Sequence, residues 1–239
     1  MHPDERIEDL MIGNLRIIQK NDSFRFGTDS ILLSLFAELK GKQRVLDIGT
    51  GSGIIPILLS YKNLESLFAG LEIQDHIADM AARSVSLNNL NDRISIVRGD
   101  VKNILDYFPK ASFDVVVTNP PYKKLGTGLM NVNESNAAAR HEILCTIEDI
   151  VKGAAQVLVP KGTLYMVNRP DRLCDTLVAL RKYKLEPKLI RFVHSKLSSS
   201  PILFLLKANL YGGENLKVGT PVLVDPNLSC KMIEEKVNL

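Results

Sequence analysis

Residues 44–53 read RVLDIGTGSG, and they indicate the class of the fold. The apolar first half predicts a buried strand over residues 44–49. Its three glycines predict a tight turn into a helix over residues 53–62. Glycine lets the chain turn sharply and lets a ligand approach the backbone amides without meeting a Cβ atom. A strand, a glycine-rich turn and a helix in this order are typical of a nucleotide-binding α/β unit.

The spacing of the glycines distinguishes this turn from two phosphate-binding loops. A dinucleotide fingerprint needs its third glycine three residues after the second, but here Gly53 follows Gly51 by two. No Gly-Lys-Ser/Thr follows, which excludes a Walker A loop. Asp47 would also place a negative charge next to a pyrophosphate. The turn therefore suits a cationic ligand that carries an amino acid and a nucleoside, with Asp47, Gly49, Gly51 and Gly53 as its binding residues.

Strands and helices alternate along the middle of the chain. Continuous apolar strands separated by helices predict a mostly parallel sheet that is covered on both faces. The last two strands follow each other without a helix and are expected to pair as an antiparallel hairpin. The fold class is therefore α/β, with a doubly wound, mostly parallel, seven-stranded sheet of Rossmann-like type. The predicted strands are 44–49, 66–72, 94–98, 113–118, 162–168, 189–193 and 202–209, and the predicted helices are 53–62, 75–87, 143–158 and 170–183.

The two ends of the chain are interpreted as additions to this core. Two apolar runs, 10–12 and 15–19, predict a short hairpin. Thr28 is placed to cap a helix over 30–39. The chain after Tyr211 is expected to form a loose hairpin with prolines at its bends. The predicted division is a cover at 1–40, a core domain at 41–210 and a tail at 211–239.

The composition is that of an ordinary globular protein. Of 239 residues, 45% are hydrophobic and 24% are charged, which excludes wholesale disorder. Trp is absent and aromatics make up 6%, which argues against an all-β carbohydrate binder. No run approaches the ~20 apolar residues that span a bilayer, and the start of the chain lacks the features of a signal peptide. Cys145, Cys174 and Cys230 show neither disulfide parity nor metal-ligand spacing, so we expect a cytoplasmic protein with no metal site and no membrane contact.

Charge is divided unevenly along the chain. Residues 1–119 hold 13 basic and 16 acidic side chains, a net charge of −3. Residues 120–239 hold 17 basic and 11 acidic side chains, a net charge of +6. Six of the basic side chains lie in 181–196, against one acid. This segment predicts a polyanion bound at one end of the molecule, although a solvated helix face would show the same pattern.

Two carboxylates stand where the second and third strands of the core end. Glu72 is placed to accept hydrogen bonds from both hydroxyls of a ribose, and Asp100 from an adenine amino group. Together with the glycine turn, this arrangement resembles the class I S-adenosylmethionine-dependent methyltransferases. The resemblance implies S-adenosylmethionine as the cofactor, with its methionine part in the glycine turn.

The fourth strand ends in Asn119-Pro120-Pro121-Tyr122. This tetrapeptide resembles the motif of methyltransferases that modify an exocyclic or amide nitrogen. Such a nitrogen is a poor nucleophile, because its lone pair is delocalised. The Asn119 side-chain oxygen and the Pro120 carbonyl can each accept one amino hydrogen, Pro121 stiffens the segment, and Tyr122 offers a face on which a base can stack. The resemblance also implies that Asn119 borders the cofactor.

Two nitrogen substrates fit this motif: adenine N6 in nucleic acid and the glutamine amide of translation release factors. The release-factor enzymes carry a helical domain of several dozen residues before the core, whereas only 46 residues precede Asp47, and these predict a hairpin, a loop and one helix. This argues against glutamine. A different RNA or DNA adenine remains an alternative. An RNA-binding protein with a vestigial cofactor pocket is a third class, but it would be expected to lack Asp47, Glu72 or Asn119.

The N-terminal residues 4–7, 17–19 and 24–33, and the later 193–196, resemble the bacterial tRNA(Val) adenine-N6 methyltransferases. That family modifies the adenine immediately 3′ of the anticodon, which implies the anticodon arm of a tRNA as the partner of a monomeric enzyme. The resemblance places Thr28 and Phe26 beside the cofactor. Relatives often carry an aromatic residue after the motif tyrosine, where this chain has Lys123, and this puts the exact substrate in question.

A long polar loop over 123–136 follows the motif. Long loops beside an active site are usually functional, and we expect this loop to be a lid that orders on RNA. The residues expected to contact RNA are Tyr122, Lys123, Lys124, Arg140 and Lys196, although Arg140 could equally be a structural ion-pair partner.

Overall fold

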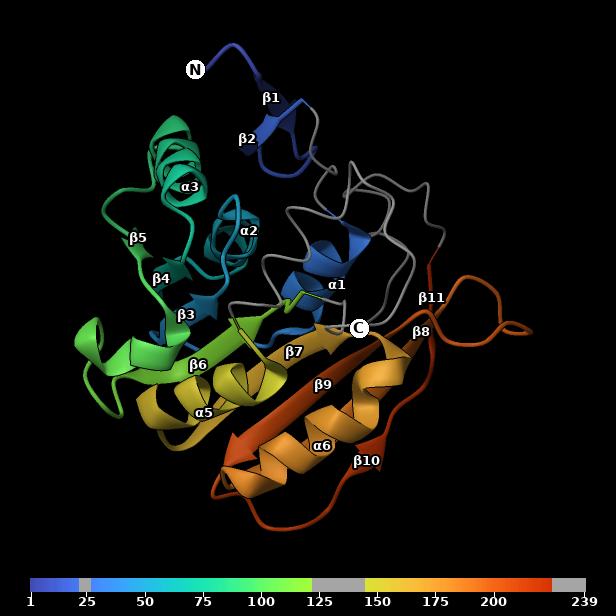
Figure 1. The fold of residues 1–239 in the computed structure, drawn as a ribbon. Helices are drawn as coiled ribbons and strands as arrows, with labels where there is room; N and C mark the ends of the chain where they lie inside the picture. Colours follow the sequence, from blue (N-terminus) through green and yellow to red (C-terminus); the bar gives the residue numbers. More distant parts are fainter. Residues whose placement is uncertain (22–26, 122–144, 225–239) are drawn as a thin grey trace.

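A mixed nine-stranded sheet forms the centre of the protein (Figure 1). The computed structural model describes residues 1–21, 27–121 and 145–224, and the statements below concern these residues. The order of strands is β10-β8-β9-β7-β6-β3-β4-β5, and β11 also pairs with β8. The strands of this sheet are β3 (Arg44–Ile48), β4 (Leu67–Glu72), β5 (Ile94–Arg98), β6 (Phe113–Thr118), β7 (Leu158–Asn168), β8 (Leu185–His194), β9 (Leu203–Leu210), β10 (Lys217–Val218) and β11 (Val222–Leu223).

Helices cover both faces of the sheet, and each face has its own apolar core. One core joins the sheet to α1, α2 and α3, and the other joins it to η1, α5 and α6 (Figure 1). This arrangement confirms the predicted α/β class, but the sheet has nine strands and not seven, because two short strands are added at the edge. The helices are α1 (Thr28–Phe36), α2 (Ile54–Lys62), α3 (Asp75–Leu87), the 3₁₀ helix η1 (Val101–Asp106), α5 (Ile147–Val157), the 3₁₀ helix η2 (Pro170–Arg172) and α6 (Leu173–Lys182).

Strand β3 shows how the sequence pattern produces the two layers. Successive side chains of a strand point to opposite faces. Val45 packs in the core under α1 and α2, whereas Leu46 and Ile48 pack in the core under α5 and α6. Asp47 therefore points to the α1 and α2 side, although its neighbours in the strand are apolar and buried.

Strand direction gathers chemically active residues at one edge of the sheet. β3 pairs in parallel with β4 and β6, β4 with β5, and β6 with β7. The carboxyl ends of these strands therefore lie together, and ligands of open α/β sheets bind at that edge. β9 is antiparallel to both β7 and β8, so β8 also ends at the carboxyl edge.

The N-terminal hairpin has a different register from the one predicted. Its strands are β1 (Glu5–Asp9) and β2 (Arg16–Lys20), so the prediction of a strand at 10–12 is wrong. Met11, Gly13 and Asn14 all have positive φ angles, which turn the chain and prevent an extended strand. The side chains of Leu10, Ile12 and Leu15 are buried in the core under the hairpin instead, whereas Met11 is exposed.

Several other features differ from the sequence prediction. β7 and β8 begin at Leu158 and Leu185, earlier than predicted, and α6 begins at Leu173, later than predicted. Gly27, and not Thr28, occupies the N-cap of α1, and the helix ends at Phe36. α5 begins later than predicted, because Thr146 and Asp149 form a capping box in which each side chain accepts from the other's backbone. The tail is not a hairpin, since β10 and β11 each pair in parallel with β8 and not with each other.

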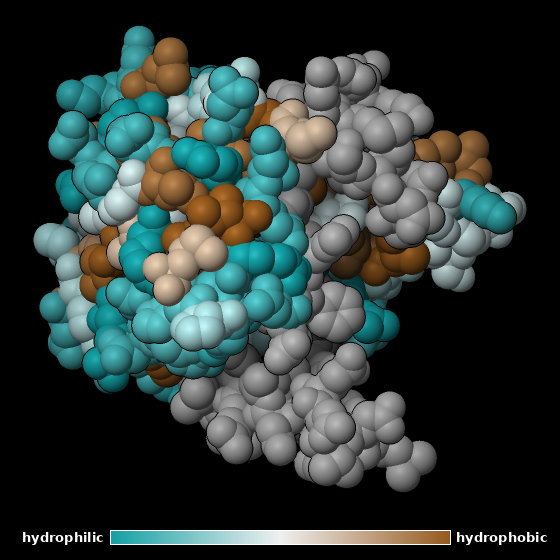
Figure 2. Space-filling view, turned by 90° about the horizontal axis from the view of Figure 1, so that it is seen from above, coloured by the Kyte–Doolittle hydropathy of each residue, from teal (hydrophilic) through white to brown (hydrophobic). Residues whose placement is uncertain are grey.

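The surface carries its apolar side chains in small groups among hydrophilic ones, as Figure 2 shows for one face. No helix among residues 1–21, 27–121 and 145–224 is long and apolar enough to cross a membrane.

Candidate functional site

The glycine turn has a backbone that only glycine adopts easily. Gly49, Gly51 and Gly53 have φ angles of +74°, +55° and +84°. A Cβ atom added at Gly49 or Gly51 would meet nothing within 4 Å, so both face open space, whereas one at Gly53 would lie 3.4 Å from the Ala81 Cβ. That distance is an ordinary van der Waals contact, so it is the left-handed backbone at the N-cap of α2 that favours glycine at Gly53. The other two glycines leave the backbone accessible to a ligand.

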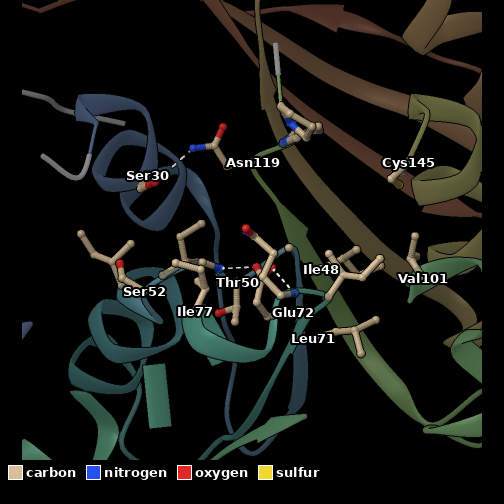
Figure 3. A pocket seen from close by; sticks show the side chains of 18 of the residues that line it. Ser30, Ile48, Thr50, Ser52, Leu71, Glu72, Ile77, Val101, Asn119 and Cys145 are labelled. Atoms are coloured by element: carbon tan, nitrogen blue, oxygen red, sulfur yellow. Dashed lines mark hydrogen bonds between the residues drawn. The ribbon is translucent and has the colours of Figure 1, made fainter. Parts of the chain in front are cut away.

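A cavity of about 450 Å³ opens over this turn, between α1 and the carboxyl ends of β3, β4, β5 and β6 (Figure 3). Its volume is within the range of small-molecule sites. Most of the predicted cofactor residues come together here. The residues at the cavity wall that the sequence predicted are Gly49, Gly51, Glu72, Asp100, Asn119, Pro120 and Pro121, and those it missed include Gln19, Ser30, Thr50, Ser52, Gln74 and Cys145.

Glu72 is held rigidly at the centre of the wall. Its Oε2 accepts from the Gly51 amide at 3.1 Å and its Oε1 from the Gln74 amide at 3.0 Å. The residue is only 5% exposed. A carboxylate has about four acceptor positions, so two remain for a ligand in the cavity. Glu72 therefore links the glycine turn to the start of α3.

Asp47 is a buried acid below the cavity. It is 1% exposed, and neither of its oxygens has a hydrogen-bond partner among the described residues. The pKa of its carboxyl is raised from 3.8 to about 7, chiefly by burial. The negative charge of Glu72 adds to this rise, and the nearby Thr50 hydroxyl opposes it. That hydroxyl is too poorly placed for a normal hydrogen bond, since it too lacks a partner. The site thus holds a carboxylate that a cation would stabilise.

Asp100 lies where β5 gives way to η1. Its Oδ1 accepts from the Lys102 amide at 2.9 Å and caps η1. The thiol of Cys145 also lines the cavity, and burial raises its pKa to about 12, so it stays protonated at neutral pH.

Asn119 lies across the cavity from Glu72, at the end of β6 (Figure 3). Its Nδ2 donates to the Ser30 hydroxyl of α1 at 3.1 Å. The preceding Thr118 is buried, and its hydroxyl donates to the Ile48 carbonyl of β3 at 2.9 Å. Ser30 therefore sets the rotation of the Asn119 amide, a contact between residues 89 positions apart that the sequence did not predict.

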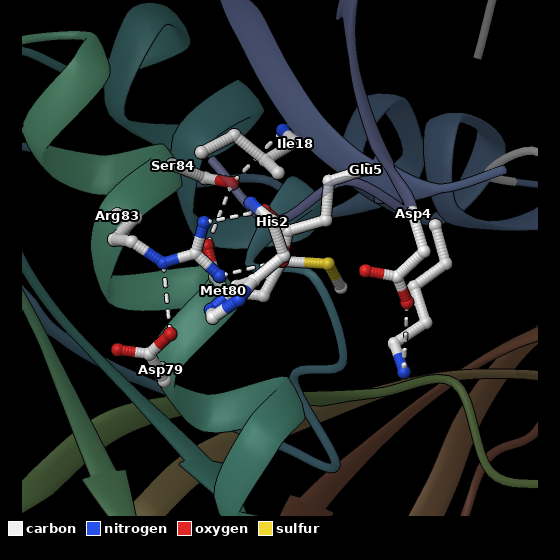
Figure 4. Close-up of polar contacts among 9 residues, drawn as sticks. His2, Asp4, Glu5, Ile18, Asp79, Met80, Arg83 and Ser84 are labelled. Carbon is white, nitrogen blue, oxygen red and sulfur yellow. Dashed lines mark hydrogen bonds and ion pairs between the residues drawn. The ribbon is translucent and has the colours of Figure 1, made fainter.

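The N-terminal hairpin forms one wall of the cavity through Gln19, which is 4% exposed. Contacts with α3 hold the hairpin in place (Figure 4). Arg83 donates to both oxygens of Glu5, at 2.6 and 2.7 Å, and lowers the pKa of that carboxyl to about 2. The Ile18 amide of β2 donates to the Ser84 hydroxyl at 3.0 Å. This attachment could not be predicted from local sequence patterns, because the partners lie 66 and 78 residues apart.

Some predicted site residues lie elsewhere. Asp47, Gly53 and Thr28 do not line the cavity. The residues of α1 and its N-cap that do are Gly27 and Ser30. Lys196 lies in the β8–β9 connection and is not part of the cavity wall. The predictions for Phe26, Tyr122, Lys123, Lys124 and Arg140 fall outside the described residues.

Within the described ranges, no group of three or more His, Cys, Asp or Glu side chains is arranged to hold a metal ion. The polar groups at the cavity are instead backbone amides, carboxylates, carboxamides and hydroxyls, which suit an organic ligand with hydroxyl and amino groups.

The fold and the site define a methyltransferase. The family model described as "Methyltransferase small domain" matches residues 20–184, and the chain belongs to that family. Solved structures with the same fold include a predicted O-methyltransferase, Atu636 of Agrobacterium tumefaciens. It is 21% identical, with a TM-score of 0.67, over 82% of this chain and 87% of that one. A SAM-dependent methyltransferase from Aquifex aeolicus is 15% identical, with a TM-score of 0.56, over 77% of this chain and 90% of that one.

Curated relatives have a more specific name. The tRNA1(Val) (adenine(37)-N6)-methyltransferase of Bacteroides thetaiotaomicron is 34% identical over 164 residues, which cover 68% of this chain and 67% of the relative. The protein of the same name from Porphyromonas gingivalis is 31% identical over 175 residues, which cover 71% of this chain and 68% of the relative.

Proposed function

We propose that this protein transfers a methyl group from S-adenosylmethionine to N6 of an adenine in tRNA, the adenine that its relatives' name places at position 37 of tRNA(Val). The observation that carries the proposal is the position of Asn119-Pro120-Pro121. This segment borders a cavity whose opposite wall is a glycine turn with two buried carboxylates. A site for a nitrogen nucleophile thus faces a site for a cationic nucleoside.

The cavity fits this cofactor in several respects. Two hydroxyls of a ribose can donate to the free acceptor positions of Glu72, because its protein contacts use only two. The unpartnered carboxylate of Asp47 favours a ligand with positive charge at that end. Open space at Gly49 and Gly51 lets a ligand approach the backbone. Asp100 retains one oxygen for an amino group after capping η1. When bound, S-adenosylmethionine supplies an electrophilic methyl group on a sulfonium.

Asn119 and Pro120 would orient the nucleophilic nitrogen. Ser30 engages the Nδ2 atom of Asn119, and the amide oxygen lies on the other side of that group (Figure 3). The oxygen and the Pro120 carbonyl would each accept one hydrogen from an adenine amino group, which directs the nitrogen lone pair toward the methyl donor. No strong base is required, so most of the rate enhancement would come from positioning.

A methyl-transfer assay with labelled S-adenosylmethionine tests the proposal. The substrates would be total tRNA from cells that lack this activity, a DNA duplex and a release factor. After nuclease digestion, label in N6-methyladenosine from the tRNA supports the proposal, whereas label in DNA or in glutamine supports an alternative. Asn119→Ala should abolish transfer but leave cofactor binding intact, and unchanged turnover would refute the role of Asn119.

A further inference from the structure

The base that reaches Asn119 must come over the carboxyl edge of the sheet. The register of the strands shows which residues lie beside Asn119 at this edge. Thr118 of β6 is paired with Met166 of β7, so Arg169 follows β7 level with the Asn-Pro-Pro segment. β9 pairs antiparallel with both β7 and β8, so β8 runs parallel to β7 and ends at His194 on the same edge. Lys196 follows two residues later.

Arg169 offers its charge to solvent at this position. Its side chain is 59% exposed, and its Nε lies 3.6 Å from Asp171, whose side chain is 64% exposed. An exposed ion pair of this kind contributes little to stability. A phosphate group could therefore displace Asp171 at little cost.

Lys196 is presented by an ordered turn. The Ser199 hydroxyl donates to the Lys196 carbonyl at 2.7 Å, and the Ser199 amide donates to the same oxygen at 3.0 Å. The Ser199 carbonyl contacts His194 Nδ1 at 2.8 Å. The Lys196 ammonium is exposed and has no partner among the described residues. The turn fixes the backbone and leaves this charge free for a ligand.

Most of the other cations of the 181–196 segment make contacts within the protein, whereas Lys184 is exposed at the amino edge. Arg191 donates from Nε to the Thr220 carbonyl at 2.9 Å. Arg181 pairs with Glu186 at 2.9 Å, Lys182 with Glu148 at 2.7 Å, and Lys188 donates to the Gly213 carbonyl at 2.8 Å. Arg181 and Lys182 end α6 before β8 begins, at the amino edge of the sheet and away from the cavity (Figure 1). The basic segment is therefore not one continuous surface.

The charges of the carboxyl edge are also divided. Glu72 and Asp100 line the β3–β5 part of the cavity and Asp47 is buried below it. These carboxylates repel a polyanion. Arg169 and Lys196 lie on the β7–β8 part. A polyanion with one base in the cavity would therefore extend over β7 and β8.

We infer that Arg169 and Lys196 form a phosphate-binding surface, here called the β7–β8 edge, that holds the tRNA backbone while the target base enters the cavity. The inference rests on the proposed function. It differs from the sequence prediction because it excludes the amino-edge cations from RNA binding.

Charge reversal at the two edges tests the inference. The edge variant is Arg169→Glu with Lys196→Glu, and the matched control is Lys161→Glu with Lys184→Glu. Both control residues are exposed and lie at the amino edge, Lys161 in the irregular first part of β7 and Lys184 in the turn before β8. The full-length proteins are compared by fluorescence anisotropy with labelled tRNA at several salt concentrations, and by calorimetry with S-adenosylhomocysteine.

The edge variant should bind tRNA about tenfold or more weakly, with a salt slope reduced by about 1 for each lost phosphate contact. Its affinity for S-adenosylhomocysteine should equal that of the wild type. The control variant should equal the wild type in its affinity for tRNA and for S-adenosylhomocysteine. If the edge variant binds tRNA as the wild type does, or if the control loses as much affinity, the inference is wrong. If charge reversal unfolds the edge variant, Arg169→Gln with Lys196→Gln gives the same comparison. Wild-type protein that binds tRNA but transfers no methyl group would contradict the proposed function and not the β7–β8 edge.

Discussion

Asp47→Asn should make the ligand-free protein more stable at high pH and weaken its cofactor binding. The native pKa of Asp47 is raised to about 7, compared with 3.8 as the ordinary value. Between these two pH values the folded state keeps a proton that the unfolded state has lost, so the stability of the wild type falls as pH rises from about 4 to about 7. Above pH 7 the full penalty is about 4 kcal/mol, at ~1.4 kcal/mol for each unit of pKa.

Asparagine removes this penalty because it carries no charge, but its buried amide lacks partners and costs about 1–3 kcal/mol. The variant should therefore be about 1–3 kcal/mol more stable than the wild type at pH 8 and about equal to it at pH 5. Urea unfolding of the ligand-free proteins at both pH values measures this difference. The reasoning is refuted if the wild type gains stability relative to Asp47→Asn between pH 5 and pH 8.

The ionised form of Asp47 should also favour a cationic ligand. Wild-type affinity for S-adenosylmethionine should rise relative to that of Asp47→Asn between pH 6 and pH 8, by up to about tenfold. The amino group of the ligand titrates in the same way with both proteins, so it cancels in the ratio of their dissociation constants. A ratio that does not change with pH would show that the ligand does not interact with this carboxylate.

Three further changes test the cavity wall. Glu72→Gln should weaken binding of S-adenosylhomocysteine about 10–100-fold by calorimetry, because a hydrogen bond to a charged group contributes about 1.5–3 kcal/mol; an unchanged constant would exclude a contact with the ligand. Ser30→Ala removes the hydrogen bond that the Asn119 amide donates to α1 and should lower kcat about tenfold with the cofactor constant unchanged. An equal loss in both would indicate general distortion. Glu5→Gln removes the negative charge that pairs with Arg83 and should speed the hydrogen exchange of β1 and β2. In the wild type, the stabilisation from this ion pair should be complete above pH 4.5 and be lost as the pH falls toward 2. Exchange that stays slow in the variant would show that the pair does not hold the hairpin.

Much of the fold could be predicted because its signals are local. α3, β5 and β6 have the predicted bounds, since each is a run of clear periodicity between turn residues. The glycine turn, Glu72 and Asp100 were recognisable because they directly follow buried strands. Errors occurred where local chemistry was misread, as at residues 10–15, where positive φ angles turn an apolar run that was predicted to be a strand.

The sequence by itself determined the alternation of strands and helices, the acidic glycine turn and the Asn-Pro-Pro segment at a strand end. These depend on neighbouring residues, so they can be read along the chain. Only the tertiary structure decided that Ser30 orients Asn119, that Arg83 fastens the hairpin to α3, and that Arg169 stands with Lys196 at one edge. Such contacts depend on strand order and direction, which place residues far apart in the chain side by side and separate residues that are close in it.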